Sequence, residues 1–369
     1  MIIGVPKEIK NHEYRVGLTT SSVRELTHHG HTVLVQKDAG TAIGLTDQDY
    51  IKAGAEILLT AEEVFAQAEM IVKVKEPQPN ECAMLRPGQI LFTYLHLAPD
   101  LPQTQALINS GCIAIAYETV TDSRGGLPLL APMSEVAGRM AIQAGAHCLE
   151  KAQGGSGILL SGVPGVPAAR VVILGGGVVG TNAARMAMGL EADVTIIDKS
   201  LPRLKELDQR FGPSLHTVYA TLDAIEHHVT HADLVIGAVL VPGAAAPRLV
   251  SRAMISKMKP GSVIVDVAID QGGCIEGAKA TTHANATFMI DGVILYCVAN
   301  MPGAVARTST FALNNATLPF TLALAEKGWK QALKDDEHLR NGLNICEGKV
   351  TYQSVADIHK MPYVASSLC

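Results

Sequence analysis

The feature that most constrains the fold is a glycine-rich turn directly after a short apolar run. In the segment RVVILGGGVVG the turn matches the pattern G-x-G-x-x-G, with glycines at Gly175, Gly177 and Gly180. The first glycine of this pattern permits a tight turn, the second lets the backbone approach a ligand, and the third lets helix and strand touch. A helical stretch and a second apolar run, DVTIID, follow the turn. The turn therefore predicts a β-α-β unit of a doubly wound α/β domain.

An acidic residue at the end of that second run bears on the ligand of the turn. Asp198 lies eighteen residues after Gly180, where a carboxylate can hold the ribose hydroxyls of a dinucleotide. The positive end of the intervening helix favours the phosphates. The carboxylate also repels a 2′-phosphate, which favours NAD over NADP. The basic neighbours Lys199 and Arg203 weaken this preference slightly, because they are able to accept a phosphate.

Strand-like runs alternate with helical stretches along most of the chain, which is typical of mainly parallel sheets. Before the glycine turn, the expected strands are Ile2–Val5, Thr32–Val35, Met70–Val74, Ile90–Leu95 and Cys112–Ala116. From the turn onward, they are 170–174, 193–198, 215–220, 233–239, 262–270 and 293–300. Six strands in this second series fit one doubly wound domain. Between the two series, a helix is expected to begin at Ser134, a good N-cap residue, and to stop at the glycines of 154–157.

The last part of the chain suggests how the domains are connected. After Arg307 only about sixty residues remain, which is small for an independent domain, and they have a helical pattern. We therefore expect this tail to pack on the N-terminal part. The predicted fold class is α/β, with two Rossmann-like doubly wound domains. Residues 1–130 and 306–369 form a discontinuous substrate domain, and residues 131–305 form an NAD-binding domain inserted into it.

Composition excludes several classes of function. A net charge of −5 and a pI near 6.2 argue against a nucleic-acid partner. No apolar run approaches the ~18 residues of a membrane span, and the N-terminus does not resemble a secretory signal. Seven cysteines without a CxxC pair suit reduced thiols, so the protein is expected to be cytoplasmic. The histidine-dense runs THHGH and EHHVTH lack the carboxylate pattern of a known metal site, so no metal is expected.

Four polar residues at strand ends or in nearby loops are candidates for catalysis: Arg15, Lys75, His96 and Asp270. They offer an anion clamp, a carbonyl polariser, a proton shuttle and a carboxylate base. An imidazole suits proton transfer because its ordinary pKa is near ~6.5. The ordinary alternatives are a core histidine, a surface arginine and a solvated lysine, since alternation puts Lys73 and Lys75 on one strand face. Asp270 belongs to the other domain, so domain closure would be needed to complete the set.

Longer motifs resemble a known family, the bacterial alanine dehydrogenases, over essentially the whole chain. They are IIGVPKEIKNHEYRVGLT, VKVKEP, YLHLAPD, APMSEVAGRMA, LGGGVVGTNAA, DVAIDQGGC and VANMPGAVARTST. The family often has alanine in place of Gly17, another residue in place of Tyr14, and proline in place of Ala306. None of these departures removes a candidate catalytic group. Ala306 could alter the flexibility of a loop near the cofactor.

The resemblance implies an oxidoreductase of amino-acid catabolism that interconverts L-alanine with pyruvate and ammonium, using NAD. Arg15 and Lys75 would bind the substrate carboxylate and carbonyl oxygen, His96 would be the general acid/base, and Asp270 would assist water activation. A homo-oligomer, commonly a homohexamer, is also implied. The residues expected to contact the cofactor are Ser134, Gly175, Gly177, Val178, Val179, Gly180, Asp198, Arg203, Val298, Asn300 and Met301.

Three other functions remain open at this point. The first is the NAD-binding subunit of a proton-translocating transhydrogenase, and the second is an opine-type or lysine-forming dehydrogenase, which needs a larger cleft. The third is a non-catalytic NAD sensor. The joint presence of Arg15, Lys75 and His96 favours the alanine dehydrogenase over the transhydrogenase subunit and the sensor. Adding 2-oxo acids together with free amino acids would expose an opine-type or lysine-forming enzyme.

Overall fold

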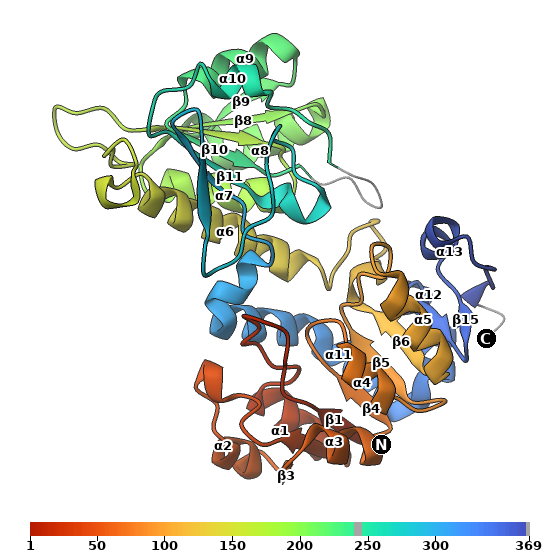
Figure 1. The fold of residues 1–369 in the computed structure, drawn as a ribbon. Helices are drawn as coiled ribbons and strands as arrows, with labels where there is room; N and C mark the ends of the chain where they lie inside the picture. The colour runs from red at the N-terminus through yellow and green to blue at the C-terminus, as the bar shows by residue number, and fades with distance from the viewer. Residues whose placement is uncertain (240–245, 367–369) are drawn as a thin grey trace. The chain divides into compact units, whose positions relative to one another are not determined.

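The chain forms two compact α/β units in the computed structural model, which describes residues 1–239 and 246–366 (Figure 1). Unit 1 contains Met1–Met133 and Val305–Cys369, and unit 2 contains Ser134–Ala304. The second unit is thus an insertion in the sequence of the first. Each unit has a mainly parallel sheet with helices on its faces, so the expected fold class is confirmed. Among the described residues, no helix combines the length and the apolarity needed to cross a bilayer.

Unit 1 is built on a sheet in the order β15-β14-β6-β5-β4-β1-β2-β3. Its parallel strands are β1 (Ile2–Val5), β2 (Thr32–Gln36), β3 (Glu56–Leu58), β4 (Met70–Val72), β5 (Ile90–Thr93) and β6 (Ile113–Ala116). The C-terminal residues join this sheet through β14 (Leu343–Cys346), antiparallel to β6, followed by β15 (Lys349–Val350). The helices are α1 (Thr20–His28), α2 (Asp47–Lys52), α3 (Ala61–Gln67), α4 (Pro79–Met84), α5 (Leu101–Ser110), α11 (Ala306–Asp335), α12 (Glu337–Arg340) and α13 (Gln353–His359).

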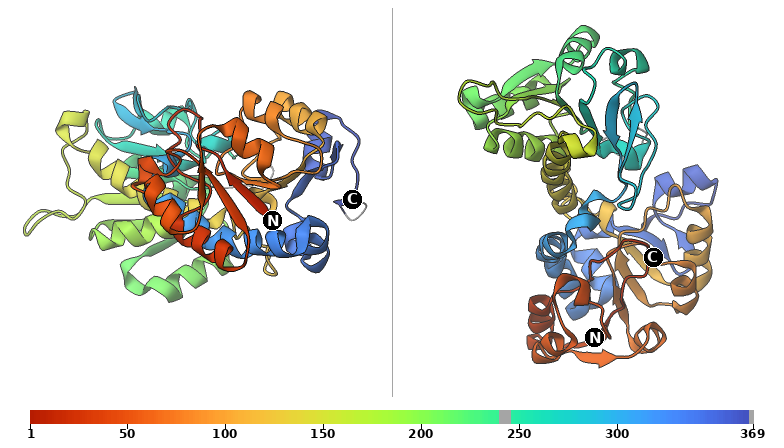
Figure 2. Two further views of the ribbon diagram at one scale, coloured as in Figure 1. Left: turned by 90° about the horizontal axis from the view of Figure 1, so that it is seen from below. Right: turned by 60° about the vertical axis from the view of Figure 1, so that its left-hand side comes forward.

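Unit 2 has a sheet in the order β12-β13-β11-β10-β7-β8-β9, in which the chain winds outward from β7 in both directions. Figure 2 draws the strands of this unit in colours from yellow-green to blue. The strands are β7 (Arg170–Leu174), β8 (Asp193–Asp198), β9 (His216–Tyr219), β10 (Leu234–Gly237), β11 (Val263–Asp266), β12 (Thr287–Ile290) and β13 (Val293–Tyr296). The helices are α6 (Ala131–Cys148), which begins in the last residues of unit 1, α7 (Val178–Gly189), α8 (Leu201–Phe211), α9 (Leu222–His231) and α10 (Arg252–Ile255).

Helices cover both faces of this second sheet, and the interiors of its central strands are therefore apolar. Along β7, Val171 and Ile173 belong to one hydrophobic cluster, whereas Val172 and Leu174 belong to the other. Burial on both faces explains why the run VVIL shows no alternation with polar residues.

Several expected element boundaries are wrong. The helix α6 begins at Ala131, so Ser134 lies in its first turn and is not its N-cap. The strand expected over 262–270 ends at Asp266, whose side chain accepts a hydrogen bond from the Ala268 amide and starts a 3-10 turn, Val267–Gln271. The strand expected to reach Val74 ends at Val72. The short strands β3 and β12 were not expected, nor were β14 and β15 in the tail that was expected to be helical.

Candidate active site

His96 lies just beyond β5 in an unusual backbone conformation. Its φ is 50°, in the left-handed region that residues other than glycine rarely adopt, and its side chain is 45% exposed. The backbone amide donates to Oε1 of Glu118 at 2.6 Å, and the amide of Leu95 donates to the same carboxylate. The imidazole stacks on the ring of Tyr94, with centroids 5.9 Å apart. His96 is therefore an exposed group held in place, not a core histidine.

Arg15 is buried in the loop between β1 and α1, with only 2% of its side chain exposed. Its Nε and Nη2 donate to the two carboxylate oxygens of Glu13 at 2.7 and 2.6 Å, and its Nη1 lies 3.1 Å from Sδ of Met133. Burial opposes the charge, but the ion pair with Glu13 holds the pKa of Arg15 above its ordinary value. The guanidinium is thus a fixed and permanently charged group, as an anion clamp requires.

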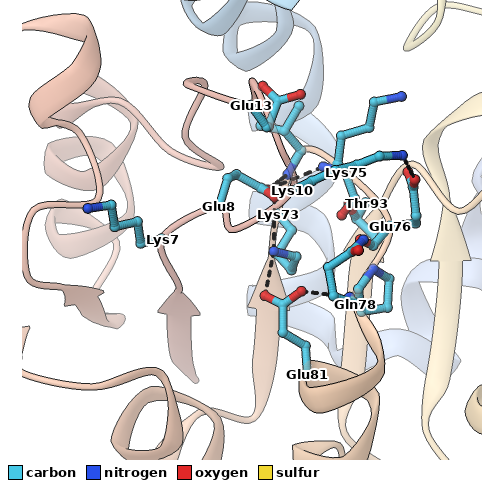
Figure 3. A network of polar contacts seen from close by, with 12 residues as sticks. Lys7, Glu8, Lys10, Glu13, Lys73, Lys75, Glu76, Gln78, Glu81 and Thr93 are labelled. Atoms are coloured by element: carbon cyan, nitrogen blue, oxygen red, sulfur yellow. Dashed lines mark hydrogen bonds and ion pairs between the residues drawn. The ribbon is translucent and has the colours of Figure 1, made fainter. Parts of the chain in front are cut away.

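Lys73 and Lys75 differ sharply in their surroundings. Lys73 is fully buried, and its Nζ donates to Glu8 at 3.0 Å and to Glu81 at 2.7 Å. Lys75 is partly exposed, and its side chain extends away from that of Lys73 (Figure 3). The expectation that both lie on one strand face is wrong, because the strand ends at Val72, before either lysine. Of the two, Lys75 is the one that reaches solvent.

Three of the four candidate catalytic residues lie at one edge of the sheet of unit 1. Arg15 follows β1, Lys75 follows β4 and His96 follows β5, and these strands are neighbours in the order β5-β4-β1. The carboxyl ends of parallel strands meet at one edge of a sheet, where ligands bind in α/β folds. Tyr94 lies near two of these residues. Its ring stacks on His96. Burial raises the pKa of Tyr94, and the positive charge of Arg15 opposes part of that rise.

The glycine turn of unit 2 is shaped to admit a ligand. A side chain at Gly180 would place its Cβ 1.8 Å from the carbonyl oxygen of Gly175, so helix α7 and the turn touch there. At Gly177, which precedes α7, a Cβ would meet no atom within 4 Å. The open space therefore lies at the helix N-terminus, whose unpaired amides favour phosphate groups.

Two charged side chains hold this turn. Oδ2 of Asp198, at the end of β8, accepts a hydrogen bond from the Gly176 amide at 2.6 Å. Arg203 donates from Nε to the Gly176 carbonyl at 2.6 Å and from Nη2 to the Thr181 hydroxyl at 2.7 Å. Glycine turn, helix amides and carboxylate together fit the phosphates and ribose of a nucleotide cofactor.

The other predicted residues of unit 2 follow strands of its sheet at the carboxyl edge, where the glycine turn also lies, except Ser134. Asp270 is exposed in the 3-10 turn that follows β11, and the loop after β13 carries Val298, Asn300 and Met301. Asn300 has a φ of 64°, a second left-handed residue beside the predicted cofactor site. Ser134 lies instead in the first turn of α6. Asp270 belongs to unit 2, whereas Arg15, Lys75 and His96 belong to unit 1.

Sequence reasoning missed the residues that hold the candidate catalytic groups. Glu13 grips the guanidinium of Arg15, Glu118 fixes the backbone of His96, and Glu8 contacts the segment that carries Lys75. Glu118 is 22 residues from His96, and no spacing rule connects them. The contact between Glu13 and Arg15 was predictable, because a carboxylate two residues before an arginine is close enough to pair with it.

Comparisons with known proteins agree along the whole chain. The family models "Alanine dehydrogenase/PNT, N-terminal domain" and "Alanine dehydrogenase/PNT, C-terminal domain" match residues 4–137 and 141–353. An alanine dehydrogenase of Halomonas elongata is 62% identical, over 100% of this chain and 99% of that protein. A solved L-alanine dehydrogenase is 51% identical with a TM-score of 0.95, covering 98% of this chain and 99% of the other. A transhydrogenase from Sinorhizobium meliloti is 27% identical with a TM-score of 0.81, covering 95% and 99%.

Proposed function

The chain belongs to the alanine dehydrogenase/PNT family, and we propose that it catalyses the reversible NAD-dependent oxidative deamination of L-alanine. The resemblance seen in the motifs is thereby confirmed, and the protein is an amino-acid dehydrogenase. One observation supports the assignment most strongly: Arg15, Lys75 and His96 follow three neighbouring strands at one sheet edge, in a chain 51–62% identical to named alanine dehydrogenases. The transhydrogenase alternative is less supported, because that relative is only 27% identical.

In the proposed mechanism, Arg15 binds the carboxylate of alanine, and Glu13 keeps the guanidinium oriented. NAD held by the glycine turn and Asp198 would supply the acceptor for the hydride that leaves Cα of alanine in its free-amine form. Water then adds to the resulting iminium carbon, and His96 takes a proton of that water while Asp270 assists its activation. His96 gives this proton to the carbinolamine nitrogen and takes up the hydroxyl proton as the C–N bond breaks, so ammonia leaves and Lys75 stabilises the carbonyl oxygen that forms. In the reverse direction His96 returns the proton, as a general acid.

The cofactor preference and the assembly are further parts of the proposal. The carboxylate of Asp198 beside the glycine turn supports NAD over NADP. A homo-oligomer is supported by an exposed apolar loop of unit 2, in which Leu159, Val163 and Val166 are 62%, 54% and 58% exposed. That the oligomer is a homohexamer is proposed from the family resemblance alone. Among the described residues, the buried thiols of Cys82, Cys112, Cys148, Cys274 and Cys297 are consistent with a reducing cytoplasm.

A substrate panel tests the proposed function. The purified protein is incubated with NAD or NADP and with L-alanine, D-alanine, glycine or L-serine, and reduced nicotinamide is followed by absorbance. We expect the fastest reduction with L-alanine and NAD, and NADH oxidation with pyruvate plus ammonium. No reduction with L-alanine would refute the proposal and favour the transhydrogenase module. A requirement for a second amino acid in place of ammonium would indicate an opine-type or lysine-forming enzyme.

A further inference from the structure

A buried charge cluster lies next to the segment that carries Lys75 (Figure 3). It consists of Glu8, Lys73 and Glu81, whose side chains are 2%, 0% and 1% exposed. Nζ of Lys73 donates to Oε2 of Glu8 at 3.0 Å and to Oε1 of Glu81 at 2.7 Å. The second oxygen of Glu81 accepts a hydrogen bond from the amide of Gln78, at the start of α4. The cluster thus connects the loop after β1 with the segment between β4 and α4.

Glu8 also grips the backbone of that segment. Its Oε1 accepts hydrogen bonds from the amides of Val74 at 2.7 Å and of Lys75 at 3.2 Å. On the opposite side of the same residue, the hydroxyl of Thr93 donates to the carbonyl oxygen of Lys75 at 3.0 Å. The backbone of Lys75 is therefore held by a side-chain contact at both its amide and its carbonyl group.

The cluster is costly to maintain, which argues that it does more than fill space. Buried ion pairs are often no more stabilising than apolar side chains of similar volume, because their desolvation offsets their attraction. Burial also raises the pKa of Glu8, and the charge of Lys73 opposes that rise. Lys73 therefore helps to keep the Glu8 carboxylate ionised, with one oxygen on the ammonium and the other on the two amides.

We propose that Glu8 is a positioning residue for substrate binding, which fixes the backbone of Lys75 so that the lysine ammonium meets the substrate oxygen. The inference rests on the proposed function, in which Lys75 binds that oxygen. Small displacements of a group that contacts a reacting molecule have large effects, because about 1 Å can change a rate by ~10²-fold. Glu8 acts through Lys75 and does not itself touch the substrate.

The test is the substitution Glu8→Gln, which keeps the shape of the side chain but turns NH₂ donors toward either Lys73 or the two amides. We expect the KM values for L-alanine and pyruvate to rise by about tenfold or more, with the KM for NAD unchanged. Adding Lys73→Met should restore part of the KM, because the amide oxygen no longer has to face the ammonium and can accept from the two backbone amides. A purely structural role would lower the melting temperature and the amount of active enzyme but leave these KM values unchanged.

A second variant keeps the test decisive if Glu8→Gln does not fold. Thr93→Val is nearly isosteric and removes only the contact with the Lys75 carbonyl, so it should raise the same two KM values to a smaller extent. Lys7→Met is the matched control: Lys7 is exposed and points away from the cluster, so its kinetics should be those of the wild type (Figure 3).

The variant Lys75→Met distinguishes a failure of the positioning role of Glu8 from a failure of the proposed role of Lys75. If Lys75→Met raises the KM for alanine while Glu8→Gln and Thr93→Val do not, the positioning role is refuted and the proposed function stands. If Lys75→Met itself leaves the KM for alanine unchanged, the role of Lys75 in the proposed function is refuted, and the positioning role with it.

Discussion

At the scale of single residues, His96 has a backbone conformation that costs free energy. A left-handed φ in a residue other than glycine costs about 1–2 kcal/mol, and it persists only where neighbouring contacts impose it. At His96 those contacts are the hydrogen bonds from the Leu95 and His96 amides to Glu118, together with the stacking on Tyr94. They hold the imidazole outside the core, at the carboxyl edge of the sheet. Strain of this kind, maintained beside exposed polar groups, is typical of functional sites.

The first prediction follows from this placement. His96→Ala should lower kcat for alanine oxidation by about 10²–10⁴-fold, because general acid–base catalysis contributes that much. The affinity for NADH, measured by fluorescence titration, should hardly change, because the glycine turn belongs to unit 2. His28→Ala, at an exposed histidine of unit 1, is the control. Normal turnover of the His96 variant would overturn the catalytic assignment.

The second prediction concerns the carboxylate beside the glycine turn. Asp198→Asn removes a negative charge but keeps an oxygen for the Gly176 amide. The ratio of kcat/KM for NADP to that for NAD should therefore rise by about tenfold, a change of ~1.4 kcal/mol. Asp193→Asn, at the opposite end of the same strand, should leave the ratio unchanged. An enzyme that already prefers NADP before substitution would contradict the interpretation of Asp198.

At the scale of elements, the strand–turn–helix of unit 2 offers a matched pair of glycine substitutions, and these make the third prediction. Gly180→Ala forces a Cβ to within 1.8 Å of the Gly175 carbonyl, so unit 2 should lose both thermal stability and cofactor affinity. Gly177→Ala meets no protein atom within 4 Å, so it should fold normally and lose cofactor affinity alone. Melting curves and NADH titrations of both variants check this. Unaltered affinity in Gly177→Ala would mean that no ligand approaches the turn.

The turn after β11 gives a prediction about pH. Burial raises the pKa of Asp266 to about 6, although hydrogen bonds from Cys274 and Ala268 oppose the rise. A carboxyl group with a raised folded-state pKa contributes stability below its ordinary pKa near ~4, and this contribution is lost as the pH rises through about 6. The melting temperature of Asp266→Asn minus that of the wild type should therefore be more positive at pH 7 than at pH 4. A difference that is the same at both pH values would contradict the shift.

The limits of sequence reasoning also lie at this scale. Central strands such as β7 and the glycine turn were predictable, because apolar runs and glycine spacing are local signals. The ends of β4 and β11 were not. Glu8 holds the amides after Val72 through a tertiary contact, and Asp266 caps the turn after β11 through a local contact in a run that otherwise resembles a strand. The surroundings of Lys73 were not predictable either, because its contacts are also tertiary. Its partners Glu8 and Glu81 are 65 and 8 residues away, and no periodicity reveals them.

At the scale of the whole molecule, each of the two units has hydrophobic clusters of its own. One hydrophobic cluster is built from strands and helices of unit 1, and two others lie on the two faces of the unit 2 sheet. The predicted substrate groups belong to unit 1, and the predicted nucleotide groups belong to unit 2. A ligand of one unit should therefore stabilise that unit directly.

The single tryptophan makes this division measurable. Trp329 is the one tryptophan in the sequence, and it lies in α11, within unit 1. Its fluorescence therefore reports the unfolding of unit 1, whereas far-ultraviolet circular dichroism reports both units. At a concentration of NAD about 100 times its Kd, binding should stabilise unit 2 by ~2.7 kcal/mol. For a unit of this size that is a rise of roughly 5–10 °C in Tm.

We expect NAD to raise a transition seen by circular dichroism while the transition seen by Trp329 fluorescence stays within about 2 °C of its value without NAD. The reason is that the ligand binds the folded turn of unit 2, and only that unit gains the binding free energy directly. The variant Gly177→Ala, which keeps the fold but blocks the approach of the phosphates, should abolish the shift. If both probes moved together by the same amount, the two units would unfold as one cooperative body, and binding at the glycine turn would stabilise the substrate groups of unit 1 as strongly as its own sheet.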